Sequence, residues 1–159
     1  IPISNIKLDM VILNYYLNII FDLLFDTTSI FFEECVNEGL LDSSIDIDYN
    51  STNEHKIIVF EFKTKKYKEV INKINKVLNN IKIDANDLER RKKSRIIKLI
   101  YRFDSITTVN NLIIKNIISY NKLYENTYEI INSLNIDELN NLIKNIDISN
   151  RSIYVIKNK

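Results

Sequence analysis

Glycine, proline, cysteine and histidine each occur only once in the 159 residues, and tryptophan is absent. Because glycine and proline supply most strained turns, their scarcity predicts long helices joined by short polar connections. The single cysteine, Cys35, cannot form a disulfide within the chain, which favours a reducing, cytoplasmic location. We expect Cys35 to be a small buried apolar side chain, since a nucleophilic thiol needs a nearby base and the one histidine lies beyond a predicted turn.

An excess of either charge is also lacking. The net charge of +1 argues against a general electrostatic attraction to nucleic acid or to an anionic membrane. The hydrophobic content of 45% and the charged content of 27% are typical of a soluble globular protein. The length predicts a single domain over residues 1–159. Since the chain begins without Met or a signal-peptide pattern, we expect it to be the interior of a longer protein.

Residues 6–25 form the longest apolar stretch. Asn14, Asn18 and Asp22 interrupt it at helical spacing and give one narrow polar stripe. Polar and charged groups are costly in the middle of a bilayer, so the pattern favours a buried helix of a soluble domain over a membrane span. The only glycine, Gly39, follows soon after and is expected to end the next helix in a left-handed conformation.

The remaining chain alternates between helical and strand periodicity. Asp84 and Ser105 are expected to cap the N-termini of two long helices. A strand hairpin flanked by helices predicts an α+β fold, an antiparallel sheet with helices packed on one face. The predicted elements are, in order, a helix over 27–37, strands over 44–50 and 56–63, helices over 65–80, 85–103, 105–120, 125–133 and 137–144, and a last strand over 151–157.

Four segments, in this order, resemble the carboxy-terminal domain of bacterial insulinase (pitrilysin) family zinc peptidases. They are residues 25–41, which include Glu38-Gly39-Leu40-Leu41, and residues 87–93, 103–106 and 123–139. The resemblance covers nearly the whole chain and implies a domain that walls a peptide chamber. Such a domain usually has further strands upstream, so we expect the sheet to be truncated at its N-terminal strands.

The resemblance also implies where chemistry belongs in this family. Zinc is bound by an H-x-x-E-H helix, and this chain, with His55 alone, cannot form one. The family's substrate-binding arginine and tyrosine fall at Val36 and Asp42, so this chain has neither residue at the expected position. We therefore expect no catalytic residue, no metal ligand and no cofactor here, with zinc only in a missing domain or a partner. Gly39, Asp84 and Ser105 are expected to be structural.

Two charged clusters have alternative interpretations. The run Arg90 to Arg95 suggests a phosphate-binding helix, but apolar neighbours such as Leu88 and Leu99 favour a helix whose charges face solvent. The acids Asp42, Asp46 and Asp48 lack the glycine and terminal glutamate of a calcium loop, so solvent exposure is expected. His55 is expected to be a solvated residue of the hairpin turn.

Three functional hypotheses remain at this point. The first is a non-catalytic domain of an insulinase-family peptidase, paired with a zinc-bearing domain on the same chain or on another subunit and in contact with an extended peptide. The second is an inactive scaffold or interaction subunit that kept the fold. The third, weaker hypothesis is a nucleic-acid-binding module based on residues 90–95, whose affinity would fall steeply with salt. Neither of the first two involves nucleic acid or a membrane.

Overall fold

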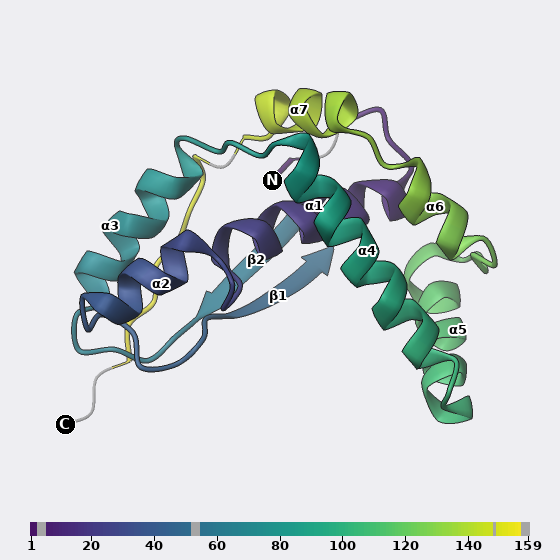
Figure 1. Ribbon diagram of the computed structural model, residues 1–159, viewed down its shortest axis with the longest axis horizontal. Helices are drawn as coiled ribbons and strands as arrows, with labels where there is room; N and C mark the ends of the chain where they lie inside the picture. Colours follow the sequence, from purple (N-terminus) through teal and green to yellow (C-terminus); the bar gives the residue numbers. More distant parts are fainter. Residues whose placement is uncertain (3–5, 52–54, 148, 157–159) are drawn as a thin grey trace.

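The computed structural model describes residues 1–2, 6–51, 55–147 and 149–156. Seven helices and two strands follow one another within these ranges (Figure 1). In chain order they are α1 (Met10–Phe25), α2 (Ile30–Asn37), β1 (Asp46–Ser51), β2 (Lys56–Glu61), α3 (Tyr67–Leu78), α4 (Ala85–Arg102), α5 (Ile106–Tyr120), α6 (Thr127–Ser133) and α7 (Ile136–Asn145).

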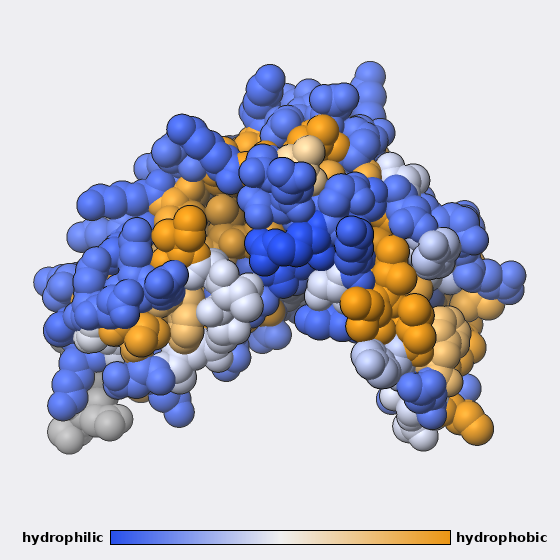
Figure 2. All heavy atoms as spheres, viewed as in Figure 1, coloured by the Kyte–Doolittle hydropathy of each residue, from blue (hydrophilic) through white to orange (hydrophobic). Residues whose placement is uncertain are grey.

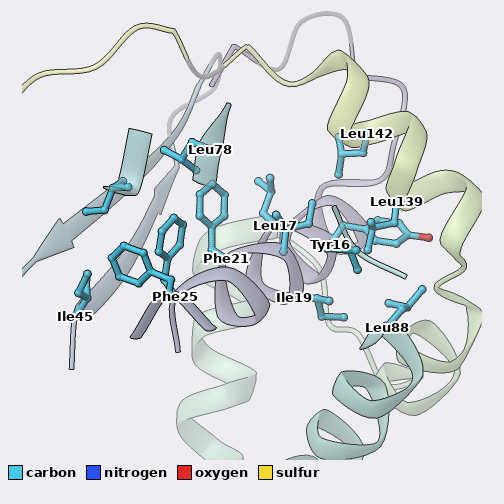
Figure 3. Close-up of a cluster of buried hydrophobic side chains, with 14 of the residues drawn as sticks. Tyr16, Leu17, Ile19, Phe21, Phe25, Ile45, Leu78, Leu88, Leu139 and Leu142 are labelled. Atoms are coloured by element: carbon cyan, nitrogen blue, oxygen red, sulfur yellow. The ribbon is translucent and has the colours of Figure 1, made fainter. Parts of the chain in front are cut away.

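Helix α1 is the centre of the hydrophobic core. Asp9 caps it by accepting a hydrogen bond of 2.8 Å from the backbone N–H of Val11. Apolar residues occupy most of its faces, and other elements cover them on several sides, as Figure 3 shows for Leu78, Leu88 and Leu139. The predicted buried helix is thus confirmed. Its fully buried large side chains are Leu13, Tyr16, Leu17, Ile19, Ile20 and Phe25.

The two strands form an antiparallel hairpin in which Tyr49 lies opposite Ile58. Aromatic rings attach the hairpin to α1: the ring centroids of Phe60 and Phe25 are 5.0 Å apart, and those of Phe60 and Phe21 are 5.9 Å apart. Helices therefore pack on one face of the sheet, as the sequence predicts for an α+β fold. The third strand expected over 151–157 is wrong for its described part, because residues 151–156 pair with no strand.

Helix α2 ends at Asn37 as its sequence predicts, but it begins at Ile30, three residues later than expected. The Ser29 hydroxyl accepts a hydrogen bond of 3.1 Å from the backbone N–H of Phe32. At the other end, Gly39 has φ of 61° and donates its N–H to the Val36 carbonyl at 2.9 Å, while the N–H of Leu40 reaches the Cys35 carbonyl at 2.7 Å. This is a Schellman motif, whose left-handed position suits glycine because it has no Cβ.

The predicted caps of the later helices are also present. The Asp84 carboxylate accepts a hydrogen bond of 2.8 Å from the backbone N–H of Asp87, and the Ser105 hydroxyl accepts one of 3.3 Å from Thr108. At the C-terminus of α5, Asn121 takes a left-handed conformation with φ of 49°. These three local signals define where α4 and α5 begin and where α5 ends.

The elements together form an arch (Figure 1). One limb holds α2, α3 and the base of the hairpin, and the other is an arm made of the end of α4 and all of α5, residues 97–120. Figure 2 shows apolar surface along this arm. Exposed apolar residues there include Ile106, which is 81% exposed, and Ile118, which is 79% exposed. None of the described side chains of α5 is buried.

The stretch Met10–Asn37 has the length and hydropathy of a membrane-crossing helix. It is nevertheless broken at residues 26–29 into α1 and α2, and α1 supplies the largest part of the core. A buried core helix and a membrane-spanning helix are both rich in apolar residues. The composition of this stretch therefore does not by itself assign it to a membrane.

Candidate functional site

The positions where the insulinase-family resemblance places an arginine and a tyrosine lie near the turn after α2. Val36 is 45% exposed on the last turn of α2, and Asp42 is exposed on the connection to β1. A valine side chain has no donor, and an ionised aspartate only accepts hydrogen bonds, so neither can hold a substrate carbonyl. The structure therefore offers no substitute at these two positions.

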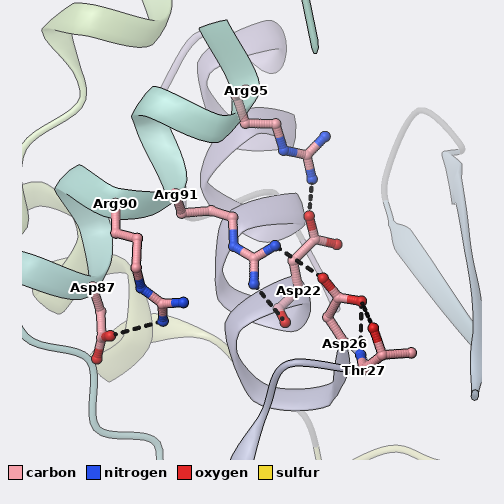
Figure 4. A network of polar contacts seen from close by, with 7 residues as sticks. All are labelled: Asp22, Asp26, Thr27, Asp87, Arg90, Arg91 and Arg95. Atoms are coloured by element: carbon pink, nitrogen blue, oxygen red, sulfur yellow. Dashed lines mark hydrogen bonds and ion pairs between the residues drawn. The ribbon is translucent and has the colours of Figure 1, made fainter. Parts of the chain in front are cut away.

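A pair of arginines lies instead where α4 crosses α1 (Figure 4). The Arg91 guanidinium is 3.0 Å from the carboxylate of Asp26 and donates a second hydrogen bond of 3.4 Å to the Asp22 carbonyl. Arg95, one turn further along α4, forms an ion pair with the Asp22 carboxylate. Arginines and aspartates are each four residues apart, so the two helices meet through two successive ion pairs.

This arrangement corrects the expectation that the charges of residues 90–95 face solvent. Arg90 does, and it pairs with Asp87 on its own helix at 3.1 Å. Arg91 and Lys92, however, are each only 7% exposed, and the Lys92 amine donates to the Leu134 carbonyl at 2.9 Å. A sequence signal existed: Asp22 lies in the last turn of a long apolar helix, where a carboxylate needs a partner.

The ion pairs shift one pKa within the network. Burial of the Asp26 carboxyl opposes its ionisation, but hydrogen bonds from Arg91 and from Thr27 outweigh that effect and lower its pKa. Within the described residues, the Nε of Arg95 is buried without a hydrogen-bond partner. The guanidinium groups of Arg91 and Arg95 therefore hold α4 against α1, and only some of their N–H groups remain without a hydrogen bond.

Tyr49 of β1 lies close to this network. Its ring meets Phe21 edge-on with centroids 6.5 Å apart. Burial of the phenol, followed by the negative charge of Asp22, raises the pKa of Tyr49 above its ordinary value. The structure thus brings Tyr49 near Arg91 and Arg95, two arginines that the sequence alone does not connect with it.

The outer edge of β1 is open, since no other described strand pairs with it. Ile1 and Lys56 exchange backbone hydrogen bonds of 2.8 Å in both directions, so the Lys56 backbone points away from β1. Because this direction alternates along an antiparallel strand, the opposing residues Ile47 and Tyr49 direct their own N–H and C=O groups to the free edge of β1. An extended peptide could pair with these groups.

The described part of the chain contains no group of three or more His, Cys, Asp or Glu side chains that could hold a metal ion. His55 is exposed and forms a bridge with Pro2 immediately before β2, so it belongs to a short strand pair and not to an unstructured turn. Cys35 is fully buried in the core, as predicted, and its burial raises the thiol pKa. The acids Asp42, Asp46 and Asp48 are exposed, also as predicted.

No protein-family model and no curated protein matches the chain. A solved structure does: the crystal structure of a "putative M16-like peptidase" from Alicyclobacillus acidocaldarius, with a TM-score of 0.67 and 16% sequence identity. The fold is that of part of an M16-like peptidase. The match covers 84% of this chain and 33% of the Alicyclobacillus chain, so the sequence spans about a third of that protein's length.

M16-like peptidases are the insulinase-type family that the four sequence segments resemble. The likeness therefore confirms the resemblance at the level of fold and confirms the α+β class. At 16% identity it shows the fold alone and carries no residue's role from one protein to the other.

Proposed function

We propose that this chain is a non-catalytic domain of an insulinase-type zinc peptidase, which walls a peptide-binding chamber and pairs with a zinc-bearing domain. The observation that carries the proposal is the fold likeness to an M16-like peptidase over 84% of the chain. With a single histidine the chain cannot itself form an H-x-x-E-H zinc site. Any zinc chemistry must then come from another domain of the same polypeptide or from a separate subunit.

The open edge of β1 supports a role in binding an extended peptide. Strand addition uses backbone hydrogen bonds and needs no particular side chain. It therefore does not depend on the arginine and tyrosine that are absent at Val36 and Asp42. In this role the domain holds one side of the peptide while the partner domain supplies the reacting centre.

The pairing with a zinc-bearing domain is tested by the coding region and by isolation of the native complex. We expect either an H-x-x-E-H helix upstream of Ile1 in the same reading frame, or a co-purifying protein with that motif after crosslinking and mass spectrometry of the tagged chain. Absence of the motif from both places would contradict the proposal.

Peptide binding is tested by fluorescence anisotropy with extended Val- and Ile-rich peptides. Each peptide is compared with two N-methylated versions that block alternate backbone N–H groups. Because only every second N–H of an added strand faces β1, we expect one version to lose binding and the other to keep it. Equal binding of both versions would show that strand addition is not the mode of recognition.

A catalytically inactive scaffold is the second candidate. It is favoured by the absence of the family's arginine and tyrosine at Val36 and Asp42. It is also favoured by the ion pairs that Arg91 and Arg95 form with aspartates of α1. The two candidates differ in one assay, the cleavage of unfolded peptides by the native complex. Cleavage that a zinc chelator stops supports the peptidase domain, and a stable complex without such cleavage supports the scaffold.

A further inference from the structure

The two faces of the hairpin differ in charge. The register sets Asp46 opposite Glu61 and Ile47 opposite Phe60. Because side chains alternate between the faces of a strand, Ile47 lies with Phe60 on the face that packs on α1. Asp46 and Asp48 lie with Glu61 on the other face, the outer face of the hairpin. Two carboxylates therefore border the open edge of β1, and a third lies on the neighbouring strand.

These three carboxylates are exposed and have no positive partner. Within the described residues, the side chains of Asp46, Asp48 and Glu61 form no ion pair and no hydrogen bond, and the nearby exposed Lys63 pairs with none of them. Asp46 and Glu61 are directly opposite one another, and like charges in such a pair destabilise a hairpin. A cation beside Asp46 would reduce this repulsion. The outer face thus favours a basic neighbour that the described chain does not supply.

The backbone of β1 determines where such a neighbour would lie. Figure 1 shows β1 along the lower border of the arch with β2 on its other side, and Ile47 and Tyr49 direct their N–H and C=O groups to the open edge. In an added antiparallel strand, the residue opposite Ile47 would exchange both backbone hydrogen bonds with it. The residues on either side of that one would then face Asp46 and Asp48 as non-hydrogen-bonded pairs. In such pairs the Cα atoms are only about 4.5 Å apart and the side chains lie closest.

We propose that the open edge of β1 selects extended peptides in which an apolar residue has a basic residue on each side. The two basic side chains contact Asp46 and Asp48, while the apolar side chain lies beside Ile47 on the face towards α1. The backbone groups of the edge supply the binding, and the two aspartates determine its specificity. This inference names the substrate class of the proposed peptide-binding edge and rests on that proposal.

Fluorescence anisotropy with three labelled heptapeptides tests the selection. Ile alternates with Lys in the first peptide, with Thr in the second and with Glu in the third. We expect the Lys peptide to bind about three- to tenfold more tightly than the Thr peptide, since each exposed pair of opposite charges across strands contributes modestly. The Glu peptide should bind most weakly. At about 500 mM NaCl the difference between the peptides should shrink, because salt screens exposed charges.

Variants of the two aspartates assign the preference to this edge. D46N/D48N should bind the Lys and Thr peptides equally and keep the affinity of the wild-type chain for the Thr peptide. D46K/D48K should reverse the order, so that the Glu peptide binds best. The control E69Q/E129Q makes the same charge change as D46N/D48N at exposed positions of α3 and α6, and it should keep the preference for the Lys peptide. Circular dichroism of each variant establishes that it is folded.

N-methylation of the Lys peptide tests the register. Methyl groups on the Ile nitrogens should abolish binding, because the Ile residues face Ile47 and Tyr49, whereas methyl groups on the Lys nitrogens should be tolerated. The reverse result would overturn the inference and leave strand addition intact. So would equal binding of the Lys and Thr peptides by the wild-type chain, or a preference that D46N/D48N retains. If none of the peptides binds, or if both methylated versions bind equally, the peptide-binding proposal itself fails and the inference fails with it.

Discussion

Two regions of this small protein are stabilised in different ways. The core region is built around α1, where Phe25 is fully buried and its ring lies 5.0 Å from Phe31 and 5.0 Å from Phe60. The arm, residues 97–120, shows the opposite pattern: its apolar side chains are mostly exposed and α5 buries none of those described. The comparison teaches that apolar composition alone does not predict which segments form the core.

The arm keeps its helical shape by local means. Ser105 caps α5 at one end and Asn121 at the other, and the helix has 15 residues. Helices of that length are marginal in water without tertiary packing. We therefore expect the arm to open more readily than the core, unless a partner covers it.

The largest expected difference comes from matched truncations in the two regions. Phe25→Ala removes a buried ring and should lower the free energy of unfolding by about 3–5 kcal/mol. Ile118→Ala, at a side chain that is 79% exposed, should change it by about 0.5 kcal/mol or less. Urea denaturation measures both. Similar losses for the two variants would mean that the arm is packed as firmly as the core.

The two ion pairs that join α4 to α1, Arg91 with Asp26 and Arg95 with Asp22, form the joint between the two regions. They provide the next comparison. Asp26→Asn leaves the buried Arg91 guanidinium without its carboxylate and should cost about 1–2 kcal/mol, which is less than for a fully buried pair because Asp26 is 37% exposed. Arg91→Met keeps the aliphatic packing. In a double-mutant cycle the two losses should sum to more than the loss of the double variant, by about 1 kcal/mol. Strict additivity would show that the ion pair does not hold α4 against α1.

The regular elements were predictable because their signals are local. The caps at Asp84 and Ser105 and the helix end at Gly39 each depend on a few neighbouring residues, and all three are confirmed. The hairpin was predictable for the same reason, since alternation and a short turn lie within one segment. Local signals also explain why the helix boundaries agree to within a few residues.

The errors concern contacts between distant segments. The apolar positions of α4 predicted exposed charges, but Arg91 and Lys92 are buried because the helix meets α1 and the Leu134 carbonyl. Residues 151–156 alternate like a strand, yet a strand needs a neighbouring backbone and the described chain places none beside them. For the candidate site, the departures at Val36 and Asp42 could be inferred from the sequence, whereas the position of Tyr49 near Arg91 and Arg95 could not.

Left-handed helix ends allow a smaller comparison, because each region has one. Gly39→Ala should destabilise the core region by about 1 kcal/mol through φ of 61° alone, since no atom lies within 4 Å of the new Cβ. Asn121→Gly relieves a similar conformation in the arm. It should slow hydrogen exchange of the α5 amides while changing global unfolding by about 0.5 kcal/mol or less. If Asn121→Gly changed the free energy of global unfolding more than Gly39→Ala, the arm would contribute more to stability than the core region, contrary to the comparison above.

The smallest expected effect is the pH dependence of the joint. The pKa of Asp26 is lower in the folded protein than in the unfolded chain, because the hydrogen bonds from Arg91 and Thr27 outweigh its burial. Its contribution to stability is therefore complete above the unfolded pKa of about 4 and is lost as the pH falls through the lower folded value. Urea denaturation at pH 6 and below pH 4 should show a loss of less than about 1 kcal/mol that Asp26→Asn lacks. Hydrogen exchange should place that loss in α4, because protonation of Asp26 releases the helix from α1, while none of the buried residues around Phe25 carries a carboxyl group. If the Asp26→Asn variant lost as much stability at low pH, the loss would come from other carboxylates and not from the contact between α4 and α1.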